Sequence, residues 1–433
     1  MTAPNARSIA LDCLLLITEE GQFSHVVLAA ARDKFAWMPE EERALTERLV
    51  HGSVEYLPQL DRLIAARSKT PFRKLKPVIR CILRLSLYQL LYLSRIPAHA
   101  VVNEAVKLTE RRGLFGLKGF VNAMVRRFVR ERDEIRAELD GSQDFALRYA
   151  LPPWLAERFT AQFGREESEK IAARFLEPAP LTLRLNRTKF IAAGEPAGVT
   201  EGLTQSPYAP DSFIAEEGLT EPIRQQLAEG MFFVQDLSSS LAVRAAQPRP
   251  GERVLDLCAA PGGKTGHILE LADCHVTALD IDAGRLKRVG DNLNRLGFGE
   301  TRKTRFQTAS LYCADARDLA AWYDGKQFDA VLADVPCTAS GVVRRNPDIK
   351  WSRRPTDAVK TARQQEALLD ALWQTLTKNG RMLLATCSVF VEENTQQLQK
   401  FLNRHADAKP AGEHVLLPNK YQDGFYYALI EKQ

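Results

Sequence analysis

The chain has 433 residues, a length that exceeds one typical domain and predicts two or three. Its composition, 45% hydrophobic and 26% charged, is ordinary for a globular protein in water. No apolar run approaches the length of a membrane span, and the first residues lack the apolar core of a signal peptide. We therefore expect neither a membrane protein nor a secreted one.

The cysteines and histidines predict no metal site and no disulfide framework. The seven cysteines are scattered without a C-x-x-C pair, and the seven histidines show no spacing typical of metal ligands. A cytoplasmic, reducing location is the simplest expectation. Four cysteines are expected to act only as small apolar side chains, namely Cys13, Cys81, Cys274 and Cys313.

Positive charge is concentrated in one part of the chain. The net charge is only +5, but the segment from Arg62 to Arg130 has 16 Lys and Arg side chains against two acids, Glu104 and Glu110. Such a block predicts a face that binds the phosphates of a nucleic acid. The alternative is a solvated helical surface without a partner.

Residues 1–135 are predicted to form consecutive amphipathic helices, and no strand-like alternation interrupts them. Apolar residues recur with helical spacing in two stripes, Ile79, Ile82, Leu83, Leu87, Leu90 and Leu91, and then Leu117, Phe120, Val121, Met124, Val125 and Phe128. Arg126, Arg127 and Arg130 fall on the opposite face of the second stripe and are candidates for nucleic-acid contacts. This part predicts an all-α domain.

Residues 136–245 differ and predict a small α+β connector. Leu181–Asn186 alternates in the manner of a half-exposed strand, and several prolines punctuate the region. The segment Gly230–Ser240 predicts a strand that leads into a helix capped by serine or aspartate.

Residues 246–433 alternate between strands and helices, which predicts a mostly parallel, doubly wound α/β sheet. The expected strands are Arg253–Leu257, His275–Leu279, Thr308–Cys313, Phe328–Ala333, Arg381–Ala385 and Phe425–Ile430. Helices are expected between them, for example at Ala283–Leu296 and Asp357–Leu376. In such sheets the ligand binds at the carboxyl ends of the strands.

The most informative segment is Val254–Thr265, with the sequence V-L-D-L-C-A-A-P-G-G-K-T. It predicts a buried strand, a tight glycine turn and the start of a helix, the corner that holds a nucleotide. The segment ends like a P-loop. However, Cys258 stands in place of the first glycine, and Pro261 removes a backbone N–H that a phosphate needs. The turn therefore favours a nucleoside without phosphates, with S-adenosylmethionine as the leading candidate and a P-loop NTPase as the alternative.

Acids follow the next two predicted strands at the same edge. Asp280 ends the second strand, where an acid accepts hydrogen bonds from ribose, although Asp282 is close enough to compete for this role. Asp315 follows the third strand, where it or its backbone could meet adenine. The alternative for each is a helix cap.

Two cysteines follow the fourth and fifth strands and are expected to meet at the ligand edge. They lie in Asp334-Val-Pro-Cys337 and in Thr386-Cys387-Ser388. Cytosine carbon 5 is a poor nucleophile, but a thiolate that adds to carbon 6 makes carbon 5 able to attack a sulfonium methyl. Asp334 is placed to stabilise this adduct at nitrogen 3 and the exocyclic amine of the base, which must lie outside any stack. Cys258 is expected only to line the cofactor turn.

The segment after Cys337 is basic, with Arg344, Arg345, Lys350, Arg353 and Arg354 around Trp351. Positive charge beside an aromatic ring suits a nucleic-acid strand that crosses the mouth of the site. The alternative is a solvated loop. Further on, Glu392, Glu393 and Asn394 are predicted to start a helix, where acids favour the helix dipole.

Three motifs, LDLCAAPGGKT, DVPCTASGV and ATCSV, occur in this order and resemble the RNA 5-methylcytosine methyltransferases. The helical part, with PFRKLKPVIRCILRLSLYQLLYL and IPAHAVVNEAV, resembles the NusB-like RNA-binding domain. The combination is similar to the RsmB (Fmu, Sun) class of 16S ribosomal RNA methyltransferases over nearly the whole chain. It implies that a Rossmann-like, class I S-adenosylmethionine-dependent methyltransferase domain follows the all-α domain and the connector.

The resemblance also implies roles for individual residues. It makes Cys387 the nucleophile and Cys337 a residue that assists release of the product. It implies cofactor contacts from Cys258, Ala259, Ala260, Pro261, Gly262, Gly263, Lys264, Asp280, Asp315 and Asp334. One departure is Val335, where the family usually has alanine and where a larger side chain could tighten the pocket. DNA 5-methylcytosine enzymes use a P-C cysteine, so Cys337 remains the second candidate nucleophile.

The expected partner is 16S rRNA, either naked or in an assembly intermediate of the small subunit. The chain is expected to act as a monomer without a metal or a membrane. The alternative from another class is a non-catalytic, NusB-like RNA-binding factor, although such a factor needs neither Cys337 nor Cys387.

Overall fold

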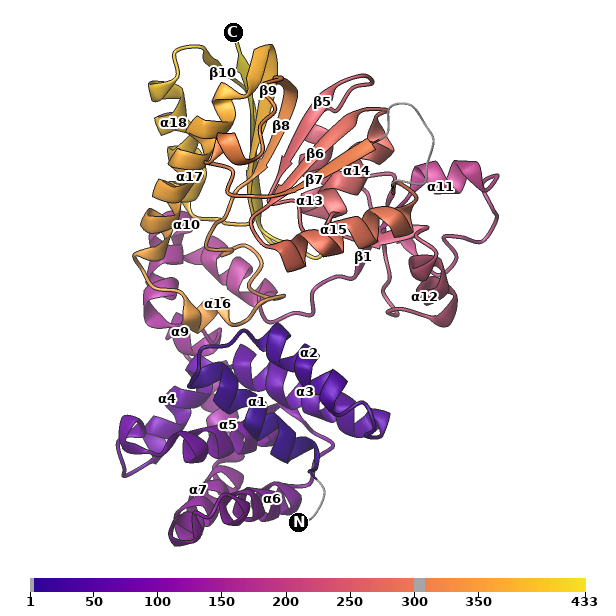
Figure 1. The fold of residues 1–433 in the computed structure, drawn as a ribbon. Helices are drawn as coiled ribbons and strands as arrows, with labels where there is room; N and C mark the ends of the chain where they lie inside the picture. The colour runs from indigo at the N-terminus through magenta and orange to yellow at the C-terminus, as the bar shows by residue number, and fades with distance from the viewer. Residues whose placement is uncertain (1–3, 300–307) are drawn as a thin grey trace. The chain divides into compact units, whose positions relative to one another are not determined.

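The computed structural model of the protein describes residues 4–299 and 308–433 (Figure 1). These residues form two compact units. The first unit runs to Glu177 and also contains Val343–Pro355, and the second contains the rest of the described chain. The three-part division, with borders after residues 135 and 245, stays a prediction.

Within the described residues the first unit is built from helices, as predicted for the N-terminal part. Both apolar stripes face the core, since Ile82 and Leu87 of one and Val121 and Phe128 of the other are all buried. The helices are α1 (Ala6–Thr18), α2 (Ser24–Lys34), α3 (Glu40–Glu55), α4 (Leu57–Arg67), η1 (Phe72–Lys74), α5 (Pro77–Tyr92), α6 (Ala98–Arg111), η2 (Phe115–Leu117), α7 (Lys118–Arg130), α8 (Arg132–Asp140), α9 (Phe145–Arg148), α10 (Pro153–Arg174) and α16 (Ile349–Ser352). No helix in the described part of the chain is long and apolar enough to cross a membrane.

The second unit begins with a small antiparallel sheet in the order β2-β3-β1-β4. Its elements are β1 (Thr182–Leu185), α11 (Arg187–Ala192), β2 (Thr204–Gln205), β3 (Ser212–Ile214), α12 (Glu221–Ala228) and β4 (Phe232–Val234). After β4 the chain enters α13 (Leu237–Ala245), and the Asp236 side chain accepts a hydrogen bond from the Ser238 N–H at 2.9 Å. The predicted strand followed by a capped helix is therefore confirmed.

The prediction that Leu181–Asn186 is half-exposed is wrong, because all four residues of β1 are buried. The alternation reflects Arg184, whose charge is paired with Glu270 inside the unit instead of facing solvent. A polar residue in a strand marks the solvent face only when it has no buried partner.

The main sheet has seven strands in the order β10-β11-β9-β8-β5-β6-β7. They are β5 (Arg253–Leu257), β6 (His275–Asp280), β7 (Thr308–Cys313), β8 (Phe328–Asp334), β9 (Leu376–Thr386), β10 (Ala408–Leu416) and β11 (Phe425–Lys432). Strands β5 to β9 pair in parallel, while β11 and β10 add antiparallel pairs at the β9 side. All six predicted strands are present. Strand β10 was not predicted, because Pro410 and Gly412 break its alternation where the register shifts.

Helices cover both faces of this sheet (Figure 1). One core contains Val276 and Ala278 of β6 together with apolar side chains of α13, α14 (Gly263–Leu271) and α15 (Ala283–Leu296). The other core contains Leu255 and Val331 together with side chains of α17 (Asp357–Gln374) and α18 (Thr395–Arg404). Short 3-10 helices η3 (Leu319–Ala321) and η4 (Val391–Glu393) lie in the connections. The predicted doubly wound α/β architecture is confirmed.

Candidate active site at the carboxyl ends of the parallel strands

The turn after β5 has the strained shape that a close approach to a ligand requires. Cys258 and Gly262 both adopt positive φ angles, 53° and 97°. A Cβ atom added at Gly262 would lie 3.1 Å from Cα of Val289 in α15, so glycine is needed for space as well as for conformation. The Pro261 carbonyl accepts a hydrogen bond from the Asn292 side chain at 2.9 Å, which ties the turn to α15.

Asp280 and Asp282, the two candidate acids for the ribose position, make different contacts in the structure. The Asp280 carboxylate is buried at the end of β6 and accepts hydrogen bonds from the N–H groups of Ala260, at 3.2 Å, and Asp282, at 3.1 Å. The Asp282 side chain accepts from the Arg285 N–H at 2.7 Å and caps α15. Asp280 is therefore tied to the turn after β5, and Asp282 serves as a helix cap.

A cavity of about 180 Å³ opens beside this turn, with Cys258, Asp280, Asp315 and Pro336 among its lining residues. Hydrogen bonds from the Arg317 side chain, one at 2.5 Å, and from its backbone N–H lower the pKa of Asp315 to about 2. Asp315 is therefore ionised and accepts hydrogen bonds only. The cavity brings together the first, second and third strand ends, as the sequence predicts.

The ammonium group of Lys264 has a carboxylate partner within the protein. Its ammonium group forms an ion pair with Asp334 at 2.6 Å, and each side chain is about one-fifth exposed. Burial lowers the pKa of Lys264, but Asp334 outweighs burial and the pKa is raised overall. In a P-loop the corresponding lysine binds a phosphate, so an internal carboxylate partner disfavours the NTPase alternative.

Asp256 is a buried acid of β5 that the sequence did not single out. Its carboxyl accepts a hydrogen bond from the Thr265 hydroxyl at 2.6 Å. Burial is the main cause that raises its pKa to about 7, and the nearby carboxylates of Asp334 and Asp280 add to this shift. Asp256 therefore carries a proton in the folded protein at mildly acidic pH.

We expect the free energy of unfolding to decrease as pH rises from about 4 to about 7 because of Asp256. The folded protein holds this proton up to a pH of about 7, whereas an unfolded aspartate releases it near about 4. The folded state thus binds more protons than the unfolded state in this window, so the slope of the free energy of unfolding against pH is negative. Asp256→Asn should remove the contribution of Asp256 to this pH dependence, and urea unfolding between pH about 4 and about 7 measures it. Asp291→Asn, at an exposed site in α15, is the control, and equal slopes for Asp256→Asn and the natural chain would refute the expectation.

The two thiols predicted to meet at the sheet edge do so. Cys337 follows β8, Cys387 follows β9, and their sulfur atoms lie 3.4 Å apart, both half-buried and free. The pKa of Cys337 is raised well above its usual range, first by its hydrogen bond to Cys387 and then by burial. Cys337 therefore keeps its proton, and either thiol can donate in the contact between the two sulfur atoms.

Close backbone contacts fix the position of Cys387. The Gly341 N–H donates to the Cys387 carbonyl at 2.9 Å, and the Gly424 N–H donates to the Gly341 carbonyl at 2.9 Å. A Cβ atom at Gly341 would lie 2.3 Å from the Gly424 carbonyl oxygen, so both glycines are needed. Val335, whose larger side chain could tighten the pocket, is buried in the core on the α17 face.

Sequence reasoning missed the buried polar side chains around the thiols. Glu393 was expected only to start a helix, but it is fully buried and hydrogen-bonded to Thr338 and Ser388, the residues that follow the two cysteines. The signal that could have found them is the set of small hydroxyl residues directly after each cysteine, which need a buried partner.

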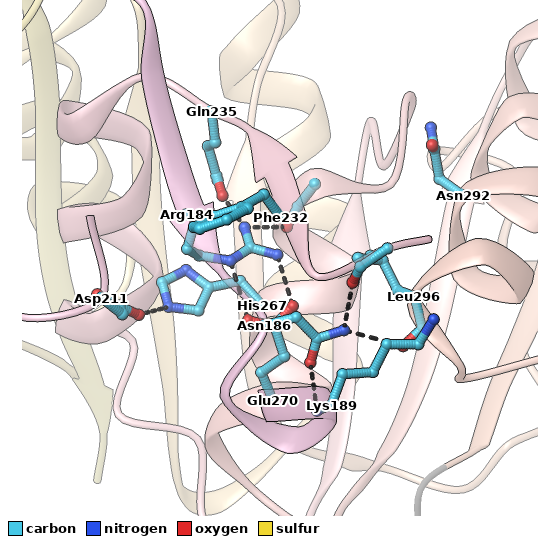
Figure 2. A network of polar contacts seen from close by, with 12 residues as sticks. Arg184, Asn186, Lys189, Asp211, Phe232, Gln235, His267, Glu270, Asn292 and Leu296 are labelled. Atoms are coloured by element: carbon cyan, nitrogen blue, oxygen red, sulfur yellow. Dashed lines mark hydrogen bonds and ion pairs between the residues drawn. The ribbon is translucent and has the colours of Figure 1, made fainter. Parts of the chain in front are cut away.

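Arg184 connects the small sheet to the helix that begins at the cofactor turn (Figure 2). Its guanidinium is fully buried and forms a bidentate pair with Glu270 of α14, with distances of 3.0 and 2.8 Å. The same group donates to the Gly263 carbonyl at 2.9 Å and to Gln235. The first residue of α14 is therefore held by β1.

Two further contacts shown in Figure 2 complete this attachment. The Asn186 amide donates to the carbonyls of Gly230, at 3.1 Å, and Leu296, at 2.9 Å, so the residue after β1 also holds the end of α15. His267 is fully buried, and burial lowers its pKa to about 3, so its ring is neutral.

Of the candidate nucleic-acid contacts, Arg126 and Arg130 are exposed on α7 and form no ion pair with an acid among the described residues. Arg127 is half-buried and paired with Glu131 at 2.6 Å. Arg344 is buried and Arg345 half-buried, in the segment Val343–Pro355 that belongs to the first unit.

Much of the positive block from Arg62 to Arg130 is neutralised by acids that lie outside it in sequence. The pairs that bring in such acids are Arg62 with Asp144, Arg67 with Glu131 and Glu138, Arg80 with Glu19, Arg84 with Asp61, Arg112 with Asp12 and Arg127 with Glu131. The block is therefore less positive in the fold than in the sequence. No group of three or more potential metal ligands occurs among the described residues.

The mixed seven-stranded sheet, with a glycine turn after β5 and acids at the strand ends, is typical of the class of Rossmann-like methyltransferases. Residues 243–431 match the family described as 16S rRNA methyltransferase RsmB/F, and residues 4–130 match the NusB family. The chain belongs to the RsmB/F family, and it is an rRNA methyltransferase with a NusB-type helical domain. Neither a P-loop NTPase nor a non-catalytic binding factor accounts for both matches.

Relatives support this assignment over the whole length. The chain is 37% identical over 443 residues to ribosomal RNA small subunit methyltransferase B of Escherichia fergusonii, covering 99% of each chain. It is 36% identical over 442 residues to the protein of the same name in Vibrio cholerae, covering 99% of this chain and 98% of that one. The crystal structure of PH0851 has a TM-score of 0.77 at 24% identity and covers 100% of both chains, which shows a shared fold.

Proposed function

We propose that the protein methylates carbon 5 of a cytosine in 16S rRNA, with S-adenosylmethionine as the methyl donor and a covalent bond between Cys387 and the base. The observation that carries this proposal is the pair of sulfur atoms 3.4 Å apart at the edge that also holds the cofactor turn. A methyltransferase that acts on a nucleophilic nitrogen or oxygen needs neither thiol.

In this mechanism Cys387 adds to carbon 6 of the cytosine, which makes carbon 5 nucleophilic. S-adenosylmethionine, when bound, supplies the methyl group. Asp334 faces the cytosine and stabilises the adduct, and its ion pair with Lys264 holds it in place. A general base, distinct from the cytosine, then accepts the proton from carbon 5, and the bond between carbon 6 and the Cys387 sulfur breaks. The protonated Cys337 thiol assists this step by donating to the departing sulfur.

The cofactor site is assigned to the turn Cys258–Lys264 and to Asp280, Asp315 and Asp334. The lining fits a nucleoside better than a nucleotide, because it combines the apolar Leu279 and Leu368 with carboxylates that accept from hydroxyl and amino groups. A phosphate would meet Asp280 and Asp315 as like charges.

The substrate is proposed to be 16S rRNA, naked or in an assembly intermediate, bound by a monomer. Methyl transfer from radiolabelled S-adenosylmethionine to both RNAs, followed by identification of the labelled nucleoside, tests the function. Label in 5-methylcytidine at one site is expected. Label in another nucleoside, or none on either RNA, would refute the proposal.

The exposed arginines of α7 give a separate expectation for RNA affinity. The combined change Arg126→Ala and Arg130→Ala should weaken binding to 16S rRNA by about 10-fold and reduce the slope of log affinity against log salt by about 1–2. The reason is the loss of two phosphate contacts, measured by filter binding at several salt concentrations. Arg363→Ala, at an exposed site in α17, is the control. An unchanged salt slope in the double variant would place the RNA elsewhere.

A further inference from the structure

Glu393 is an ionisable side chain buried completely between the two loops that carry the thiols. It ends η4, directly after the Cys387 loop, and its exposed fraction is 0%. A carboxylate in such a place is stable only when several donors satisfy its oxygens.

Glu393 accepts hydrogen bonds from the residues that directly follow the two cysteines. One carboxylate oxygen accepts from the backbone N–H of Thr338 at 2.8 Å. The other accepts from the Thr338 hydroxyl and from the Ser388 hydroxyl, both at 2.5 Å. A single carboxylate thus joins the residue after Cys337 to the residue after Cys387.

Neighbouring polar groups extend this bridge within the same two loops. The Ser340 hydroxyl lies 2.9 Å from that of Ser388 and accepts a hydrogen bond from the Val389 N–H at 3.0 Å. The Asn394 side chain accepts from the Thr386 hydroxyl at 2.6 Å and donates to the Ser388 carbonyl at 2.9 Å. The network therefore holds the chain on both sides of Cys387 and directly after Cys337.

We propose that Glu393 is the positioning residue that sets the separation of Cys337 and Cys387. The proposal deepens the proposed function, on which it rests, since a two-thiol reaction depends on that separation. The hydrogen bonds of Glu393 to Thr338 and Ser388 tie it to the residue after each thiol, and its charge also raises the pKa of Cys337. A catalytic group displaced by about an ångström loses about 100-fold in rate.

The test compares three variants of the full chain. Glu393→Ala removes all three hydrogen bonds, and Glu393→Gln keeps the size but leaves one atom unable to accept. Glu392→Ala changes the preceding glutamate of the same turn and is the matched control. Each variant is assayed for kcat, for KM and Kd of S-adenosylmethionine, and for the rate at which iodoacetamide alkylates each cysteine, read by mass spectrometry.

We expect kcat to fall by about 100-fold in Glu393→Ala and by about 10-fold in Glu393→Gln, with S-adenosylmethionine affinity unchanged. Alkylation of Cys337 should become several-fold faster in both, because its loop is no longer held. Glu392→Ala should match the natural chain. If Glu393→Ala does not fold, the results for Glu393→Gln alone decide whether Glu393 is a positioning residue.

Unchanged kcat in Glu393→Gln, a parallel loss of S-adenosylmethionine affinity, or unchanged alkylation of Cys337 would overturn the proposal. The alkylation rates need no RNA. If the natural chain methylates no cytosine, the proposed function fails, and the alkylation comparison still decides whether Glu393 holds the loops.

Discussion

Cys387→Ala should abolish methyl transfer to 16S rRNA, with a loss of at least about 10⁴-fold in kcat/KM. Without the thiolate, cytosine carbon 5 stays a poor nucleophile, and the remaining binding groups do not supply the missing activation. The sulfur contributes little to the core at its half-buried position, so the fold should be retained. The loss is measured with radiolabelled S-adenosylmethionine, and thermal unfolding of the variant checks the fold.

Cys337→Ala is the matched control, since it removes the other sulfur of the pair. Here the first bond to carbon 6 should still form while its cleavage slows. We expect a protein–RNA adduct that survives denaturing electrophoresis in Cys337→Ala and is absent in Cys387→Ala. The reverse pattern, an adduct only when Cys387 is removed, would assign the nucleophile to Cys337 and exchange the two roles.

The site was predictable where its residues stand at strand ends in a recognisable order. Asp280, Cys337 and Cys387 follow parallel strands, so their meeting at one edge follows from topology alone. The contacts that fix their positions were not predictable. Glu393 and Arg184 read as surface residues in the sequence, because a charged side chain reveals its burial only through a partner that is distant along the chain.

The same limit applies to the basic block in the first unit. Counting charges along the sequence assumes that neighbours in sequence remain neighbours in the fold. Asp12, Glu19 and Asp144 lie outside the block but pair with its arginines. Arg126 and Arg130 are exposed and pair with no acid among the described residues, so they are better candidates for RNA contacts than the block as a whole.

Arg184→Ala should destabilise the protein by about 3–5 kcal/mol, because it leaves the Glu270 carboxylate buried without its cation. Burial already raises the pKa of Glu270, and Arg184 is the main influence that opposes this rise. Urea unfolding measures the loss. Arg253→Ala, which breaks a more exposed pair with Asp324, is the control and should cost less than about 1 kcal/mol. A loss below about 1 kcal/mol in Arg184→Ala would show that Glu270 finds another partner or accepts a proton.

The combined change Arg184→Met and Glu270→Leu distinguishes the effect of Arg184 on protein stability from its effect on the affinity for S-adenosylmethionine. Replacing a buried ion pair by apolar side chains of similar size is often neutral, so most of the lost stability should return. The Gly263 carbonyl, however, still lacks the donor that Arg184 provided at 2.9 Å. Affinity for S-adenosylmethionine should therefore remain about 10-fold weaker, by loss of a hydrogen bond at the cofactor turn. Affinity that recovers together with stability would mean that Arg184 stabilises the unit without positioning the turn.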